Sequence, residues 1–154
     1  MNRLLSAGIG VVFVGLIGYS VWSSSGAQQA GGTTMSMIPP DTSNIPIGDP
    51  IVQVKLPATL SPDAVIGKRA FEAYCARCHG INAAGRNGMG PPFIYSYYRP
   101  EHHSDMAWLL APRRGVPQHH WRFGNMPPIP GPTDADLKMI VTYVRELQRA
   151  NGIQ

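Results

Sequence analysis

The sequence predicts a small all-α domain of about three helices and long loops, preceded by an apolar segment and a polar tether. Two segments, beginning at Ser61 and Thr133, combine a helix-capping residue with apolar residues spaced three and four apart. The 17 Gly and 15 Pro residues lie mainly outside these segments, which favours loops there. No segment alternates apolar and polar residues clearly enough to predict a strand.

Residues 1–22 contain an uncharged apolar stretch, residues 4–22, preceded by Arg3. Its length is about that of a helix crossing a bilayer and exceeds the usual apolar region of a cleaved signal. This favours a membrane anchor, while the small residues at 25–27 leave cleavage of a signal peptide as the alternative. In both cases Arg3 stays inside, so we expect the rest of the chain on the periplasmic side of a bacterial inner membrane.

Residues 23–60 are rich in Ser, Gly, Gln, Thr and Pro and show no sustained periodicity. This composition predicts a flexible tether to a head formed by residues 61–154. The alternative is an arm packed on the head, formed by residues 45–56. The net charge of +4 lies in the head, and it favours an acidic protein partner over nucleic acid or a small-molecule substrate.

The first predicted helix begins at Ser61, with Pro62 at its first position, and should run to about residue 77. Its apolar residues are spaced to share one face: Ile66, Ala70, Phe71 and Tyr74.

The motif Cys75-Ala76-Arg77-Cys78-His79 closes this helix. Two thiols at this spacing can each form a thioether with a haem vinyl group, and the adjacent imidazole can reach the iron. A zinc site would need more ligands, and the chain has no third Cys. A redox dithiol or disulfide is the remaining alternative. The motif therefore predicts one covalent haem c.

A second iron ligand is expected from a Met thioether, and Met126 is the best candidate. It is followed by Pro127 and Pro128, which restrict the backbone near the sulfur, and it precedes the last helix. Met89, in a Gly-rich loop, is the rival.

The middle of the head predicts one short helix, from Ser104 to about residue 111, ended or kinked by Pro112. Two histidine pairs flank it, His102-His103 and His119-His120. They could bind copper or replace Met126 on the iron, although most surface histidine pairs do neither. Trp121 either packs in the core or contacts a haem propionate. Four arginines are candidates for the surround of an exposed haem edge: Arg99, Arg113, Arg114 and Arg122.

The last helix is predicted to begin at Thr133 with a capping box and to stop at Asn151 and Gly152. Lys138, Arg145, Glu146 and Arg149 fall mainly off its apolar stripe, which consists of Leu137, Ile140, Val141, Val144 and Leu147.

With these motifs in this order, the head resembles a class I, mitochondrial-type cytochrome c. The resemblance rests on Cys75-x-x-Cys78-His79, on the later Gly-Asn-Met126-Pro segment and on the closing helix. It implies thioethers from both cysteines, axial ligation by His79 and Met126, and a close crossing of the first and last helices at Gly67. It also implies that the Pro91 carbonyl accepts a hydrogen bond from His79.

The function expected from these observations is a membrane-anchored monohaem carrier of single electrons between respiratory or photosynthetic partners. Two axial ligands leave no site for a substrate, so we do not expect an enzyme. The alternative is an electron-accepting cytochrome subunit of a periplasmic dehydrogenase or reductase. A gas sensor or a copper-handling protein would require a labile or absent Met126 ligand.

Overall fold

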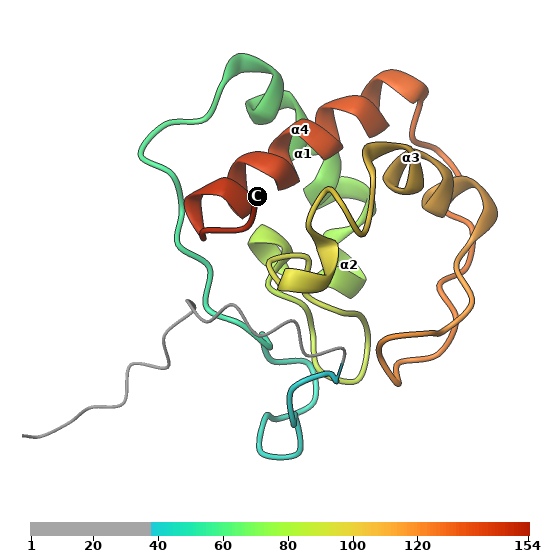
Figure 1. Cartoon of the computed structure of the whole chain (residues 1–154). Coiled ribbons are helices and arrows are strands. Elements are labelled where there is room, and N and C mark those ends of the chain that lie inside the picture. Colours follow the sequence, from blue (N-terminus) through green and yellow to red (C-terminus); the bar gives the residue numbers. More distant parts are fainter. Residues whose placement is uncertain (1–37) are drawn as a thin grey trace, which may run out of the picture.

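The computed structural model describes residues 38–154, which form a helical domain (Figure 1). Its helices are α1 (Pro62–Tyr74), α2 (Ala76–His79), α3 (Asp105–Arg114) and α4 (Asp134–Ala150), and two short 3-10 turns occupy Ile81–Ala83 and Ser96–Tyr98. Within these residues, strand-like pairing is limited to two isolated bridges, Arg86 with Gly90 and Val116 with Met126. The all-α prediction is confirmed.

Helix α1 begins as predicted but ends earlier, and only part of its predicted apolar face is buried. The Ser61 hydroxyl accepts a hydrogen bond from the Ala64 amide, and Pro62 occupies the first turn. Cys75 then departs from ideal helical geometry, so that α1 stops at Tyr74 and the motif continues in the single turn of α2. The buried residues of α1 are Ala64, Gly67, Ala70 and Phe71. Ile66 is 51% exposed and Tyr74 is 37% exposed, so the predicted face was wrong at these two residues, whereas Ala70 and Phe71 are buried as predicted.

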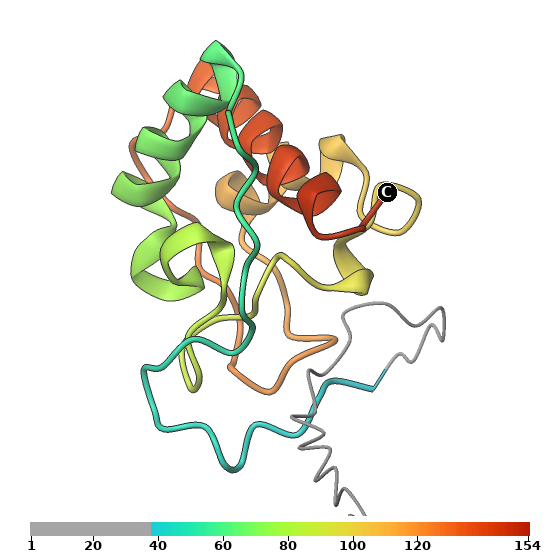
Figure 2. The same cartoon turned by 90° about the vertical axis from the view of Figure 1, so that its left-hand side faces the viewer.

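Helix α4 crosses α1 at very close range (Figures 1 and 2). A Cβ atom on Gly67 would lie 1.9 Å from the Met139 carbonyl oxygen, so only glycine permits this approach. Thr133 and Asp136 form the predicted capping box. All five residues of the predicted stripe, from Leu137 to Leu147, are buried. The crossing at Gly67 is therefore present, and it sets the distance between the two main helices.

Residues 42–56 lie along the domain, and we call them the arm (Figure 2). The Asn87 side chain donates to the Ile45 carbonyl at 2.6 Å. At the other end, Lys55 and Asn151 exchange two hydrogen bonds, of 2.9 and 2.8 Å. This part of the predicted tether thus follows the alternative of a packed arm, because buried Asn87 and the end of α4 supply partners for its backbone.

The predicted signal anchor or signal peptide at residues 1–22 lies outside the described residues, as does the start of the tether. Among residues 38–154, no helix has the length and apolar character needed to span a membrane.

Helix α3 continues through Pro112 to Arg114, beyond the end predicted for it. The Ser104 side chain precedes the helix without making a capping hydrogen bond. The carbonyl of Pro112 accepts a hydrogen bond from the Ile129 amide at 2.7 Å. This contact attaches α3 to the loop that leads into α4.

Candidate functional site

A cavity of about 450 Å³ lies inside the domain and brings together the predicted site residues. Cys75, Cys78 and His79 line it from the end of α1 and from α2, and Met126 lines it from the loop before α4. Its volume falls in the range of roughly 300–1,000 Å³ that is usual for ligand and cofactor sites. The remaining wall is largely apolar and includes Phe93, Trp108, Val116, Leu137, Ile140 and Val141.

The His79 ring is held in one orientation. It is 7% exposed, and its Nδ1 donates to the Pro91 carbonyl at 3.0 Å, the contact that the resemblance implied. Because a carbonyl can only accept, Nδ1 carries the proton and Nε2 keeps a lone pair for a metal. Phe93 stacks on the ring, with a centroid distance of 4.0 Å. Burial lowers the pKa of His79 to about 4, so the ring is in its neutral, metal-binding form near neutral pH.

The two cysteines follow one another along the last turns of the helical segment. Both thiols are free; Cys78 is exposed and Cys75 is partly buried. Burial, together with the neighbouring Cys78, raises the pKa of Cys75 to about 11. Burial therefore keeps the Cys75 thiol in its protonated form near neutral pH.

Met126 is fixed through its backbone. Its amide and carbonyl both pair with Val116, each hydrogen bond being 2.9 Å long. Gly115, in a left-handed conformation with φ +72°, lets this segment approach closely, because a Cβ there would lie 2.7 Å from the Met126 carbonyl oxygen. The rival, Met89, is 39% exposed and also lines the cavity. The fold therefore brings both candidate thioethers to the cavity wall.

The residues present fit a haem in a further respect. Trp121 lines the cavity and is 6% exposed. Its indole N–H lies beside the Tyr98 phenol but is buried without a hydrogen bond of good geometry. A buried donor without an acceptor is costly, and the carboxylates of a haem would supply acceptors. Apolar walls, two thiols, an oriented imidazole and an unsatisfied donor together match this group.

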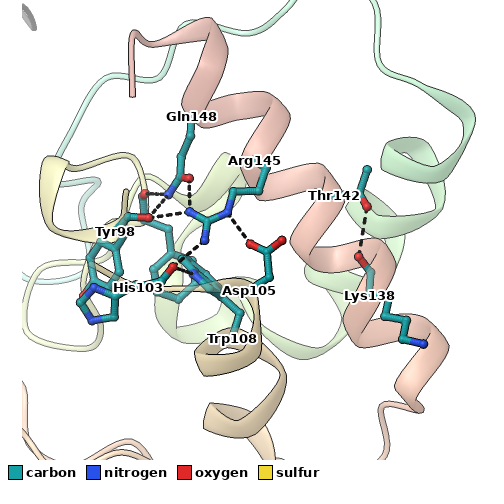
Figure 3. Close-up of polar contacts among 9 residues, drawn as sticks. Tyr98, His103, Asp105, Trp108, Lys138, Thr142, Arg145 and Gln148 are labelled. Atoms are coloured by element: carbon teal, nitrogen blue, oxygen red, sulfur yellow. Dashed lines mark hydrogen bonds and ion pairs between the residues drawn. The ribbon is translucent and has the colours of Figure 1, made fainter. Parts of the chain in front are cut away.

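One wall of the cavity is held by Arg145, a residue whose role sequence reasoning missed (Figure 3). It was predicted to lie off the apolar stripe, yet it is 8% exposed. Its guanidinium donates to the Asp105 carboxylate at 2.8 Å, to the Tyr98 carbonyl at 2.7 Å and to the His103 carbonyl at 2.5 Å. A signal was available, since Arg145 follows Val141 of the stripe by one helical turn.

Gln148 completes this network and was also missed. It is 1% exposed and accepts a hydrogen bond from Arg145 at 2.6 Å. Its own amide donates to the carbonyls of Phe93 and Tyr98, both at 3.0 Å. The network therefore anchors to α4 the segment that carries Phe93, whose ring stacks on His79.

The four arginines predicted around a haem edge differ in their surroundings. Arg113 forms an ion pair with Asp134, and Arg99 lies 3.9 Å from Glu101. Arg114 and Arg122 are exposed. The last two are the better candidates for contact with an acidic partner, which stays a prediction.

Comparison with known proteins adds one match, to a family model described as Cytochrome c, over residues 64–148. This range contains the Cys-x-x-Cys-His motif, Met126 and most of α1 and α4. No curated protein and no solved structure gives a significant match.

Proposed function

We propose, on the premise that this chain belongs to the cytochrome c family, that it carries single electrons on one haem held by Cys75, Cys78, His79 and Met126. The family is one of electron carriers that bind haem c covalently, and the two cysteines have the required spacing. When bound, haem c supplies a one-electron iron couple, while the protein supplies ligands, orientation and surroundings.

The observation that carries the proposal is the meeting of all four residues at one apolar cavity. His79 presents Nε2 because Pro91 holds its other nitrogen. Met126 offers the second ligand from a backbone fixed by Val116 on one side and by prolines on the other. We prefer it to Met89 because Met126 is the less exposed of the two.

Two protein ligands leave the iron no position for a substrate, so we assign no enzymatic activity to the chain. His79 is buried and the cavity walls are largely apolar, so these residues would limit the access of water to a bound haem. This environment favours the less charged ferrous state, as thioether ligation also does. The residues of this chain would thus set the reduction potential of the haem and hold it for electron exchange with a partner. They would not transform a substrate.

For location, we propose the periplasmic side of a bacterial inner membrane, with residues 1–22 as the anchor. The support is the uncharged apolar stretch after Arg3. The proposed partner is an acidic respiratory or photosynthetic redox protein, supported by the net charge of +4 and by exposed Arg114 and Arg122.

The test uses the full chain, produced with a haem-attachment system and purified in detergent. The intact mass and the haem content should show one haem per chain. Met126→Ala should lower the midpoint potential and allow carbon monoxide to bind the reduced protein, whereas Met89→Ala should leave both unchanged. The opposite result would reassign the ligand to Met89. Ready binding of carbon monoxide by the unmodified protein would contradict the carrier.

The same preparation tests location. A mature N-terminus within residues 1–22 and recovery from membranes would agree with an anchor, whereas a new N-terminus after residue 27 would show a cleaved signal. A second chain that co-purifies at fixed ratio would show a permanent complex instead of a free carrier.

A further inference from the structure

The two histidine pairs, which the proposed haem ligation does not use, converge in space. His102 and His103 lie in the turn before α3, and His120 lies in the loop after it. One ring nitrogen from each of these three residues lies within 4.8 Å of the others. The Nε2 atoms of His102 and His120 are 3.3 Å apart. The fold has therefore joined residues 18 positions apart into one cluster.

This spacing is that of two ligands on one ion. Zinc–imidazole bonds are about 2.0–2.1 Å long, so two nitrogens on a tetrahedral ion lie about 3.3 Å apart. A hydrogen bond between two neutral rings would also give such a distance. A hydrogen-bonded pair of rings would not require a third ring nearby. His103 supplies a third ring, as a metal site requires.

His103 is prepared as a ligand by its surroundings. Its Nδ1 donates to the Tyr97 carbonyl at 2.7 Å, so Nε2 is left without a proton in the neutral ring. A backbone carbonyl behind the imidazole is the usual support of a metal-ligating histidine. The backbone of His103 is fixed as well, because its carbonyl accepts from Arg145 at 2.5 Å and from Trp108 at 3.3 Å (Figure 3).

His120 is restrained by stacking on Tyr97, with ring centroids 4.7 Å apart and an interplanar angle of 23°. The pKa of His120 is lowered mainly by burial and, to a smaller extent, by the charges of the neighbouring histidines. Burial also lowers the pKa of His103. Both shifts favour the neutral imidazole, which is the form that binds metals.

We propose that His102, His103 and His120 form a site for one divalent transition-metal ion, separate from His79 and Met126. A ligand set of imidazoles suits Zn²⁺, Cu²⁺ or Ni²⁺ and not the oxygen-seeking Mg²⁺ or Ca²⁺. His103 and His120 also line the central cavity. An ion at the cluster would thus lie at the wall of the proposed haem site.

The test titrates Zn²⁺, which has no redox chemistry of its own, into the haem-loaded full chain by calorimetry. We expect one ion per chain. His102→Ala and His120→Ala should each weaken binding by more than about tenfold, because each removes one of three ligands. The matched control is His119→Ala, since His119 adjoins His120 but is not one of the three clustered rings. The control should retain affinity.

Absorption at the zinc edge should show three imidazole nitrogens at about 2.0–2.1 Å. The haem spectrum should be the same in all three variants, and it also reports whether each has folded. Unchanged affinity in His102→Ala and His120→Ala, or equal loss in His119→Ala, would overturn the site. Loss of an axial histidine in the haem spectrum of His120→Ala would overturn it too, by placing that ring on the iron.

Discussion

Replacing Arg145 with Met should destabilise the domain strongly, because the guanidinium is the centre of a buried network. Met keeps much of the apolar volume and removes every donor. The Nη2 bond to the His103 carbonyl is charge-assisted and is worth about 1.5–3 kcal/mol. Gln148 Oε1, in a side chain 1% exposed, loses its Arg145 donor, which costs about 1–3 kcal/mol.

Two other bonds contribute less. The Tyr98 carbonyl keeps the Gln148 amide as a donor, and the Asp105 side chain is 65% exposed, so its ion pair adds only about 0–1 kcal/mol. The expected loss is therefore about 2.5–7 kcal/mol, a large part of the roughly 5–15 kcal/mol that stabilises a domain.

The assay is denaturant and thermal unfolding of the haem-loaded protein. At roughly 4 °C per kcal/mol, Tm should fall by at least about 10 °C. The matched control is Asp105→Asn, which removes only the exposed partner of Arg145 and should cost under about 1 kcal/mol. A loss below about 1 kcal/mol in Arg145→Met, or equal losses in the two variants, would refute the reasoning.

Three further substitutions test other contacts. Gly67→Ala should cost more than about 2 kcal/mol in denaturant unfolding despite its better helix propensity, because its Cβ would lie 1.9 Å from the Met139 carbonyl oxygen; a stabilised variant would contradict the crossing. Asn87→Ala removes the side-chain donor that holds the arm, so hydrogen exchange of the arm should rise while α4 stays protected; uniform protection would show the contact to be dispensable. Thr133→Ala should lower stability by about 1 kcal/mol at neutral pH. The hydrogen bonds from Thr133 hold the pKa of Asp136 below its ordinary value, so the capping box contributes its full stability above the ordinary value. The difference between the two proteins should shrink as the pH falls below the ordinary value and through the lowered pKa of Asp136; a difference independent of pH would contradict the capping box.

The features that were predicted correctly from the sequence are those that depend on residues close together in the chain. The Cys-x-x-Cys-His motif, the caps at Ser61 and Thr133 and the stripe of α4 each depend on residues within a few positions of one another. The motif determines which atoms are available to a haem, and the periodicity determines which face of α4 is buried.

The features that sequence reasoning missed depend on partners far away in the chain. Arg145 was predicted to lie off the apolar stripe because the carbonyls that accept its hydrogen bonds belong to residues more than 40 positions earlier in the chain. The apolar face of α1 was wrong at Ile66 because Gly67, through its lack of a side chain, decides how α4 lies on the helix. The arm was taken for a tether because Asn87, distant in sequence, satisfies its backbone.

The sequence by itself determined where α1 and α4 begin, which face of α4 is buried, and the motif with its thiols and imidazole, because capping, helical periodicity and covalent spacing act within one or two turns. Only the tertiary structure decided that His79 and Met126 line one cavity and that His102, His103 and His120 meet beside it. The physical reason is that these distances follow from how α4 packs on the rest of the domain, and packing joins residues that no local pattern relates.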